Sequence, residues 1–114
     1  METNSRIKGK VIVITGASSG IGATTAKLLA SQGAQLVLGA RRIEQLRKVA
    51  ESIRKAGGEV SYLQTDVKRP EEVNALVALA QEQFGRLDVL INNAGVAQLA
   101  LLEEVDVAGW DRND

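Results

Sequence analysis

Short apolar runs alternate with helical segments along this chain, and this alternation restricts the fold more than any other feature. Each run is brief and rich in β-branched or aliphatic residues, which is typical of a strand buried on both faces. Strands that alternate with helices over short connections form a parallel sheet with helices on its faces. The sequence therefore predicts an α/β fold with a parallel sheet covered by helices. Its four strands are expected at Lys10–Thr15, Ala34–Ala40, Glu59–Val67 and Leu87–Asn92.

The helices between these strands are indicated by apolar side chains at helical spacing. Glycines at Gly33, Gly57 and Gly85 follow the three segments, and glycine is the residue that most often ends a helix. The predicted helices run from about Ile21 to Ser31, from Ile43 to Ala56 and from Pro70 to Phe84, and a fourth is expected to begin near Asp106 and to carry Trp110.

Length and charge limit the functions that this fold could serve. At 114 residues the chain has room for one domain with one core, expected to span residues 1–114. Its 14 basic and 14 acidic residues cancel, so no overall charge attracts nucleic acid or an anionic membrane. No apolar run approaches the roughly 18 residues of a membrane helix. The segment METNSRIKGK at the start also lacks the apolar core of a signal peptide.

Two missing residue types narrow the chemistry. The chain has no cysteine, which excludes disulfides and thiolate chemistry and fits a reducing compartment, so a cytoplasmic location is expected. It also has no histidine, which removes the commonest general base and the commonest metal ligand. No metal site is predicted.

A glycine-rich loop, TGASSGIG, joins the first predicted strand to the first helix. In a dinucleotide site, Gly16 would allow the tight turn, Gly20 would let the backbone approach a pyrophosphate, and Gly22 would let the helix pack on the strand. The helix start would then offer free N–H groups to the phosphates. The alternatives are a turn in another phosphate- or sugar-binding domain, or a purely structural turn. A P-loop is excluded, because no G-K-[ST] closes the loop.

The end of the second strand indicates which dinucleotide would be bound. An acidic residue there would bond the ribose 2′-hydroxyl, whereas arginine accommodates a 2′-phosphate. The chain has Arg41 and Arg42 at this point and no acid before Glu44. The sequence therefore predicts NADP(H) rather than NAD(H). The alternative is that both arginines are merely solvated at the end of the strand.

Four motifs at the ends of the four strands together resemble the short-chain dehydrogenase/reductase family, in its NADP-dependent branch. The similarity runs from about Lys8 to Arg112. The motifs are TGASSGIG (Thr15–Gly22), ARR (Ala40–Arg42), DV (Asp66–Val67) and NNAG (Asn92–Gly95).

The resemblance implies a role for each motif, because ligands of open α/β sheets bind at the carboxyl ends of the strands. Asp66 would accept a hydrogen bond from the adenine amino group, although it could also cap the helix at Pro70. Asn92 and Asn93 could instead serve turn chemistry. The resemblance implies that Gly16, Ser18, Ser19, Gly20, Ile21 and Gly22 line the pyrophosphate, that Arg41 and Arg42 meet the 2′-phosphate, that the Val67 backbone lies beside adenine, and that Asn92, Ala94 and Gly95 flank the ribose.

The family's catalytic residues have no counterpart here. The family uses a tyrosine, a lysine four positions later and an upstream serine, but the only tyrosine is Tyr62, inside the third strand, with Asp66 four positions on. Ser18 and Ser19 are interpreted as loop donors. The expectation is therefore a truncated, cofactor-binding half without catalytic residues, inactive alone, whose parent would transfer hydride between NADP(H) and a carbonyl or hydroxyl substrate.

The resemblance also implies a Rossmann-like, doubly wound parallel sheet, of which this chain supplies a part: four strands in the order 3-2-1-4. It implies in addition an exposed, apolar edge at Leu87–Asn92 through which the chain could self-associate. The alternatives to the enzyme interpretation are a non-catalytic module that binds NADP(H) and an interaction fragment.

Overall fold

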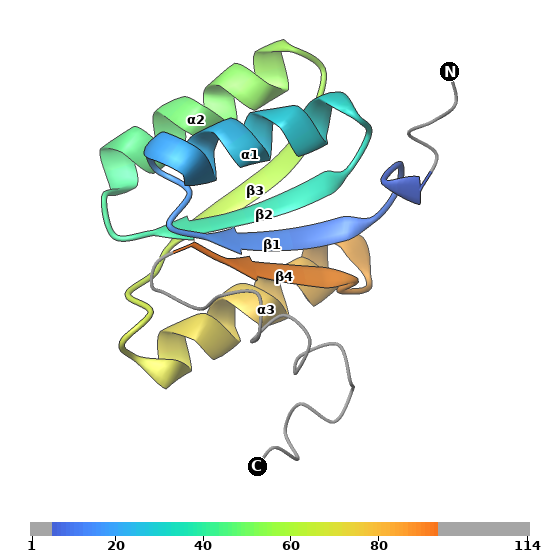
Figure 1. The fold of residues 1–114 in the computed structure, drawn as a ribbon. Helices are drawn as coiled ribbons and strands as arrows, with labels where there is room; N and C mark the ends of the chain where they lie inside the picture. Colours follow the sequence, from blue (N-terminus) through green and yellow to red (C-terminus); the bar gives the residue numbers. More distant parts are fainter. Residues whose placement is uncertain (1–5, 94–114) are drawn as a thin grey trace.

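The computed structural model describes residues 6–93, which form a four-stranded sheet with helices on both faces (Figure 1). All strand pairs are parallel and the order is β3-β2-β1-β4, which confirms the predicted topology. Ala94, Gly95 and the helix expected near Asp106 lie outside the described residues. The elements are β1 (Val11–Thr15), α1 (Gly20–Ser31), β2 (Gln35–Ala40), α2 (Ile43–Lys55), β3 (Glu59–Gln64), α3 (Pro70–Phe84) and β4 (Val89–Asn92).

The two central strands of the sheet, β1 and β2, are buried on both faces, as their apolar runs predict, whereas β3 and β4 are only partly buried. Helices α1 and α2 cover one face and α3 covers the other (Figure 1). In β1, Ile12 and Ile14 belong to the cluster beneath α1 and α2, while Val11 and Val13 belong to the cluster beneath α3. Because successive side chains of a strand point to opposite faces, a continuous β-branched run serves both layers.

Strand β3 is shorter than predicted. It ends at Gln64 rather than Val67, and the chain then turns away from the sheet. Thr65 N still donates to Ala40 O at 2.8 Å, but Lys68 N donates to the Asp66 carboxylate at 3.0 Å. An aspartate that accepts from the backbone two residues later closes a turn, and this turn ends the strand.

Strand β4 also differs from its prediction. It begins at Val89 instead of Leu87, because Asp88 bonds the backbone of Val11 through both its own N–H and its carboxylate. Among the described strands, β4 pairs with β1 alone and forms an edge. Its side chains are less exposed than predicted, since Leu90 is buried and its neighbours are half-buried against the two clusters.

None of the helices in residues 6–93 has the length and apolar character needed to span a membrane.

Candidate functional site

The glycine loop brings helix α1 into direct contact with the end of β1. Gly16 has φ of 64°, in the left-handed region that favours glycine. A Cβ placed on Gly22 would lie 2.0 Å from the carbonyl oxygen of Gly16 and 2.9 Å from its carbonyl carbon. Any side chain at position 22 would therefore push the start of α1 off the turn. Ala17 N donates to Gly39 O at 3.2 Å and holds the same turn against β2.

The start of α1 carries no side chain that neutralises it. Ser19 is the N-cap residue, but its side chain makes no capping hydrogen bond, and the first turn contains no acidic residue. Helix α2, in contrast, has Glu44 in its first turn, and α3 has Glu71 and Glu72. The partial positive charge at the amino end of α1 is thus left available to an anion.

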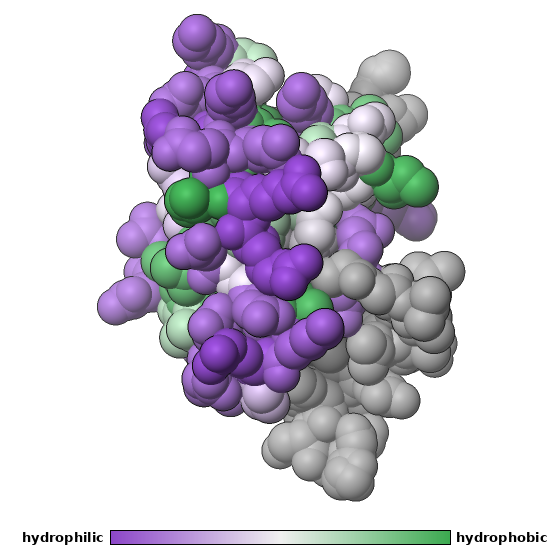
Figure 2. Space-filling model, turned by 90° about the vertical axis from the view of Figure 1, so that its left-hand side faces the viewer, coloured by the Kyte–Doolittle hydropathy of each residue, from purple (hydrophilic) through white to green (hydrophobic). Residues whose placement is uncertain are grey.

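A pocket of about 230 Å³ lies beside this helix start, at the carboxyl ends of β1, β2 and β3. It collects predicted site residues from three separate segments of the sequence. Figure 2 looks onto the side of the molecule at which the strand arrows of Figure 1 end, and most of the described surface there is hydrophilic. The pocket is lined by Gly16, Ser18, Ala40, Arg41, Arg42, Thr65, Asp66, Val67 and Lys68.

Two of these lining residues were missed by the sequence analysis. Thr65 is buried, and its hydroxyl donates to Leu63 O at 2.9 Å. Lys68 follows the Asp66–Val67 pair and adds a third cation to the pocket wall. The sequence offered no signal for Thr65 or Lys68. The third strand was expected to continue to Val67, so the turn at Asp66 that brings Lys68 to the pocket was not predicted.

The cations of the pocket are not paired with protein carboxylates. Among residues 6–93, Arg41, Arg42 and Lys68 form no ion pair, and Arg42 makes only a long 3.5 Å contact with Gln45 Oε1. The nearest acid in the sequence, Glu44, is instead bonded to Arg47. Positive charge at the end of β2 is therefore available for a ligand.

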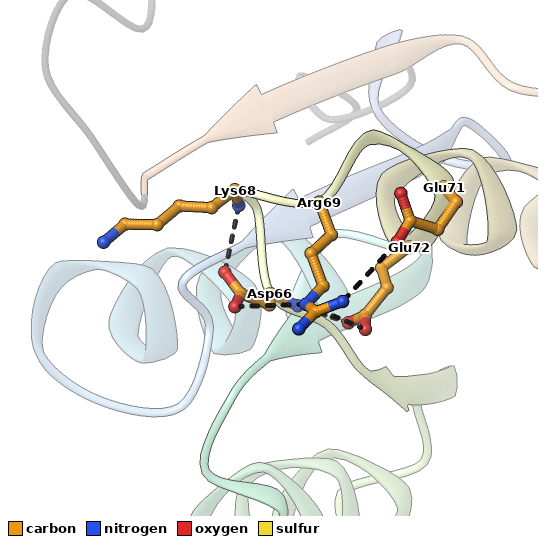
Figure 3. A network of polar contacts seen from close by, with 5 residues as sticks. All are labelled: Asp66, Lys68, Arg69, Glu71 and Glu72. Atoms are coloured by element: carbon orange, nitrogen blue, oxygen red, sulfur yellow. Dashed lines mark hydrogen bonds and ion pairs between the residues drawn. The ribbon is translucent and has the colours of Figure 1, made fainter.

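The turn after β3 fixes the position of Asp66 (Figure 3). The backbone N–H of Asp66 donates to Glu72 Oε1 at 2.8 Å, and the Asp66 carboxylate accepts from Lys68 N and lies 3.9 Å from Arg69 Nε. The alternative role of Asp66 as the cap of the Pro70 helix is wrong. The N-cap of α3 is Arg69, and no side chain caps this helix.

Asn92 is the last residue of β4 and lies next to the end of β1, where the glycine loop begins, and Asn93 follows it. Thr15 Oγ1 donates to Asn92 Oδ1 at 2.7 Å, which ties the carboxyl ends of β1 and β4 together. The side-chain Nδ2 of Asn93 is buried and has no hydrogen-bond partner among the described residues. Tyr62 lies apart from the pocket-lining residues, within β3, where the Arg54 guanidinium is 5.8 Å from its ring centroid.

The family model for short chain dehydrogenases matches residues 10–113. The chain belongs to this family. Among curated proteins, an uncharacterised oxidoreductase of Staphylococcus saprophyticus is 49% identical over 108 residues, covering 95% of this chain and 43% of that protein. The chain thus spans less than half the length of this relative.

Two solved structures of short-chain dehydrogenases share the fold. A metagenomic short-chain oxidoreductase in complex with NADP has a TM-score of 0.74 and 46% identity, over 81% of this chain and 42% of that one. An enzyme of Burkholderia phymatum in complex with NAD has a TM-score of 0.77 and 44% identity, over 79% of this chain and 32% of that one. Family members of this similarity therefore include proteins seen with either nicotinamide cofactor.

Proposed function

We propose that this chain forms the NADP(H)-binding part of a short-chain dehydrogenase that transfers hydride between NADP(H) and a carbonyl or hydroxyl substrate. One observation carries the proposal: at the carboxyl edge of the sheet, a single pocket gathers part of the glycine loop with the end of β2 and the turn after β3. The residues concerned are Gly16, Ser18, Arg41, Arg42, Asp66 and Val67. In open α/β sheets, ligands bind at this edge.

The glycine loop fits a pyrophosphate. The uncapped start of α1 supplies N–H groups and a positive dipole end, and Ser18 and Ser19 add hydroxyl donors. Space beside Gly20 is open, so a ligand can approach its backbone closely. Ile21 is 77% exposed at the start of α1, where its apolar side chain can contact a ring of the bound cofactor. Because Gly22 has no side chain, the start of α1 packs against the turn at Gly16, so that its N–H groups can point toward a bound pyrophosphate.

The preference for NADP(H) over NAD(H) rests on Arg41 and Arg42. Both line the pocket and neither is paired with a carboxylate in the described part of the chain, so both can bond a 2′-phosphate. Asp66 and the Val67 backbone would recognise adenine, and Asn92, Ala94 and Gly95 would flank the ribose. A nicotinamide cofactor held by these residues would supply the chemistry of hydride transfer. We infer that proton transfer uses residues of a longer parent, so that this chain alone binds cofactor without turnover.

Three further expectations stay predictions: that residues 1–114 form one cofactor-binding domain, that the protein is cytoplasmic, and that the β4 edge mediates self-association. Size-exclusion chromatography of the chain tests the last of these.

The test of the proposed function is a titration of the folded chain with NADPH and with NADH, followed by cofactor fluorescence. The expected result is saturable binding with NADPH preferred about ten- to a hundred-fold, since a charge-assisted bond is worth roughly 1.5–3 kcal/mol. Equal affinity for the two cofactors would remove the 2′-phosphate role of Arg41 and Arg42. A folded chain that binds neither would show that the pocket is not sufficient for a cofactor site.

A further inference from the structure

Arg41 stands between two pockets. It lines the cofactor pocket described above, and it also lines a second pocket of about 360 Å³. The second pocket contains a competing guanidinium, Arg69, and two carboxylates, Asp66 and Glu72, together with Gln64. Gln64 Nε2 donates to the backbone carbonyl of Arg41 at 2.9 Å, which holds Arg41 at this boundary. The Arg41 side chain therefore has carboxylates within the second pocket as possible partners.

Those carboxylates are paired with Arg69 instead (Figure 3). Arg69 Nε lies 3.9 Å from Asp66 Oδ2 and 3.9 Å from Glu72 Oε2, and Arg69 Nη1 lies 3.8 Å from Glu71 Oε2. Arg41 has no carboxylate partner among the described residues. Of the two guanidinium groups that line the second pocket, Arg69 is therefore paired with both carboxylates there, and Arg41 has no ion pair among the described residues.

We propose that Arg69 is a positioning residue for cofactor specificity: by pairing with Asp66 and Glu72, it keeps Arg41 available to a ligand phosphate. The proposal rests on the proposed function and deepens it. If Arg69 were neutral, Arg41 would be the guanidinium left in the second pocket and would be drawn toward Glu72. It would then turn away from the cofactor pocket, where the 2′-phosphate would bind.

The expected effect is modest, because Arg69 is 61% exposed and Glu72 is 38% exposed. Ion pairs in such solvated positions are weak. Replacing Arg69 by glutamine should weaken NADPH binding by about two- to five-fold and leave NADH binding unchanged. NADH is the internal reference, since a general distortion of the Asp66 turn would weaken both cofactors alike.

Two double variants separate pairing from a general change in charge. R69Q/E72Q removes one of the two carboxylates that share the second pocket with Arg41 and keeps Asp66, and the glutamine oxygen can still accept from Asp66 N. R69Q/E71Q restores the same net charge through Glu71, which does not line the second pocket. We expect R69Q/E72Q to recover most of the NADPH preference and R69Q/E71Q to recover little. R47Q is the control for removing an ion-paired arginine elsewhere, since Arg47 pairs with Glu44 and Glu51 on α2.

Circular dichroism is used first to check that each variant is folded. The titrations of the folded variants then distinguish ion pairing by Arg69 from a general effect of charge. Equal recovery in the two double variants would indicate a general field effect and would overturn the inference. So would an R69Q chain with an unchanged NADPH preference, or one that loses both cofactors equally. If the unmodified chain prefers NADH or binds neither cofactor, the proposed function fails and this inference fails with it. If the unmodified chain prefers NADPH, any failure concerns Arg69 alone.

Discussion

Replacing Gly22 by alanine tests how the glycine loop is built. The added Cβ would lie 2.0 Å from Gly16 O and 3.1 Å from the Cα of Ala17, so both obstacles are backbone. Real Cβ atoms essentially never come within 3.0 Å of another heavy atom, so the separation from Gly16 O must grow by at least about 1 Å. The turn cannot easily yield, because Ala17 is fully buried and its N–H is bonded to Gly39 O. Helix α1 must therefore move by about 1 Å, and its N–H groups would move away from the phosphate position.

The expected net cost to the free energy of unfolding is about 0–2 kcal/mol. Overpacking against rigid groups costs about 1–3 kcal/mol or more, while alanine would by itself favour a helix interior by about 1 kcal/mol. Gly57→Ala is a suitable control, because Gly57 has φ of 93° but no atom within 4 Å of its added Cβ. That strain alone costs about 1–2 kcal/mol. Urea denaturation followed by circular dichroism gives the stabilities, and NADPH fluorescence gives the affinities.

The expected result is that the two variants lose similar stability, but that Gly22→Ala loses NADPH affinity at least ten-fold while Gly57→Ala keeps its affinity. A Gly22→Ala chain as stable as the parent, with NADPH affinity within about two-fold, would refute the close contact between α1 and the turn and the role derived from it.

Two further predictions concern charge. Replacing Arg41 by aspartate and Arg42 by alanine should shift the preference from NADPH toward NADH by about ten- to a hundred-fold. A titration in which the preference stays the same would contradict the binding of the 2′-phosphate by these arginines. At the opposite edge of the sheet, burial raises the pKa of Asp88, but hydrogen bonds from Arg86 and Val11 N lower it more, so the pKa lies below its ordinary value. Its stabilising effect should therefore be present at neutral pH and be lost as the pH falls through that lowered value. The stability difference between the parent and Asp88→Asn, measured by urea denaturation, should shrink over the same acidic range; a difference independent of pH would contradict this.

The sequence predicted the sheet correctly because its signals are local and repeated. Each buried run of β-branched residues specifies a strand, and the short connections leave only a parallel arrangement. This arrangement places the ends of β1, β2 and β3 at one edge, so Gly16, Arg41 and Asp66 could be assigned to one pocket without coordinates. Their common location follows from topology alone.

The sequence did not predict the details that depend on turns. The segment after β3 was expected to remain extended, whereas Asp66 accepts from Lys68 N and turns the chain. That turn brings Lys68 to the pocket wall and Arg69 to three carboxylates. Periodicity carries no information about such side-chain bonds. The side chains of β4 were likewise expected to be more exposed, whereas Leu90 is buried and its neighbours pack against a core cluster.

The uncapped start of α1 allows a test in which stability and binding respond in opposite directions. Ser19 occupies the N-cap position without a capping bond, so Ser19→Asp would add an acceptor and a negative charge at the positive end of the helix. An acidic residue there usually stabilises a helix by about 0.3–1 kcal/mol. The same charge would repel a pyrophosphate. We therefore expect Ser19→Asp to unfold at a slightly higher urea concentration and to bind both NADPH and NADH about ten-fold more weakly.

Ser52→Asp is the matched control, since it adds the same charge to an exposed position on α2 away from the pocket, and it should leave both affinities unchanged. If Ser19→Asp retains both affinities, the amino end of α1 does not face the phosphates. If it weakens NADPH alone, the new charge acts on the 2′-phosphate instead, and the helix start lies nearer to the arginines than to the pyrophosphate. Only a loss shared equally by the two cofactors is consistent with α1 as the pyrophosphate site, because the pyrophosphate is the charged group that NADPH and NADH have in common.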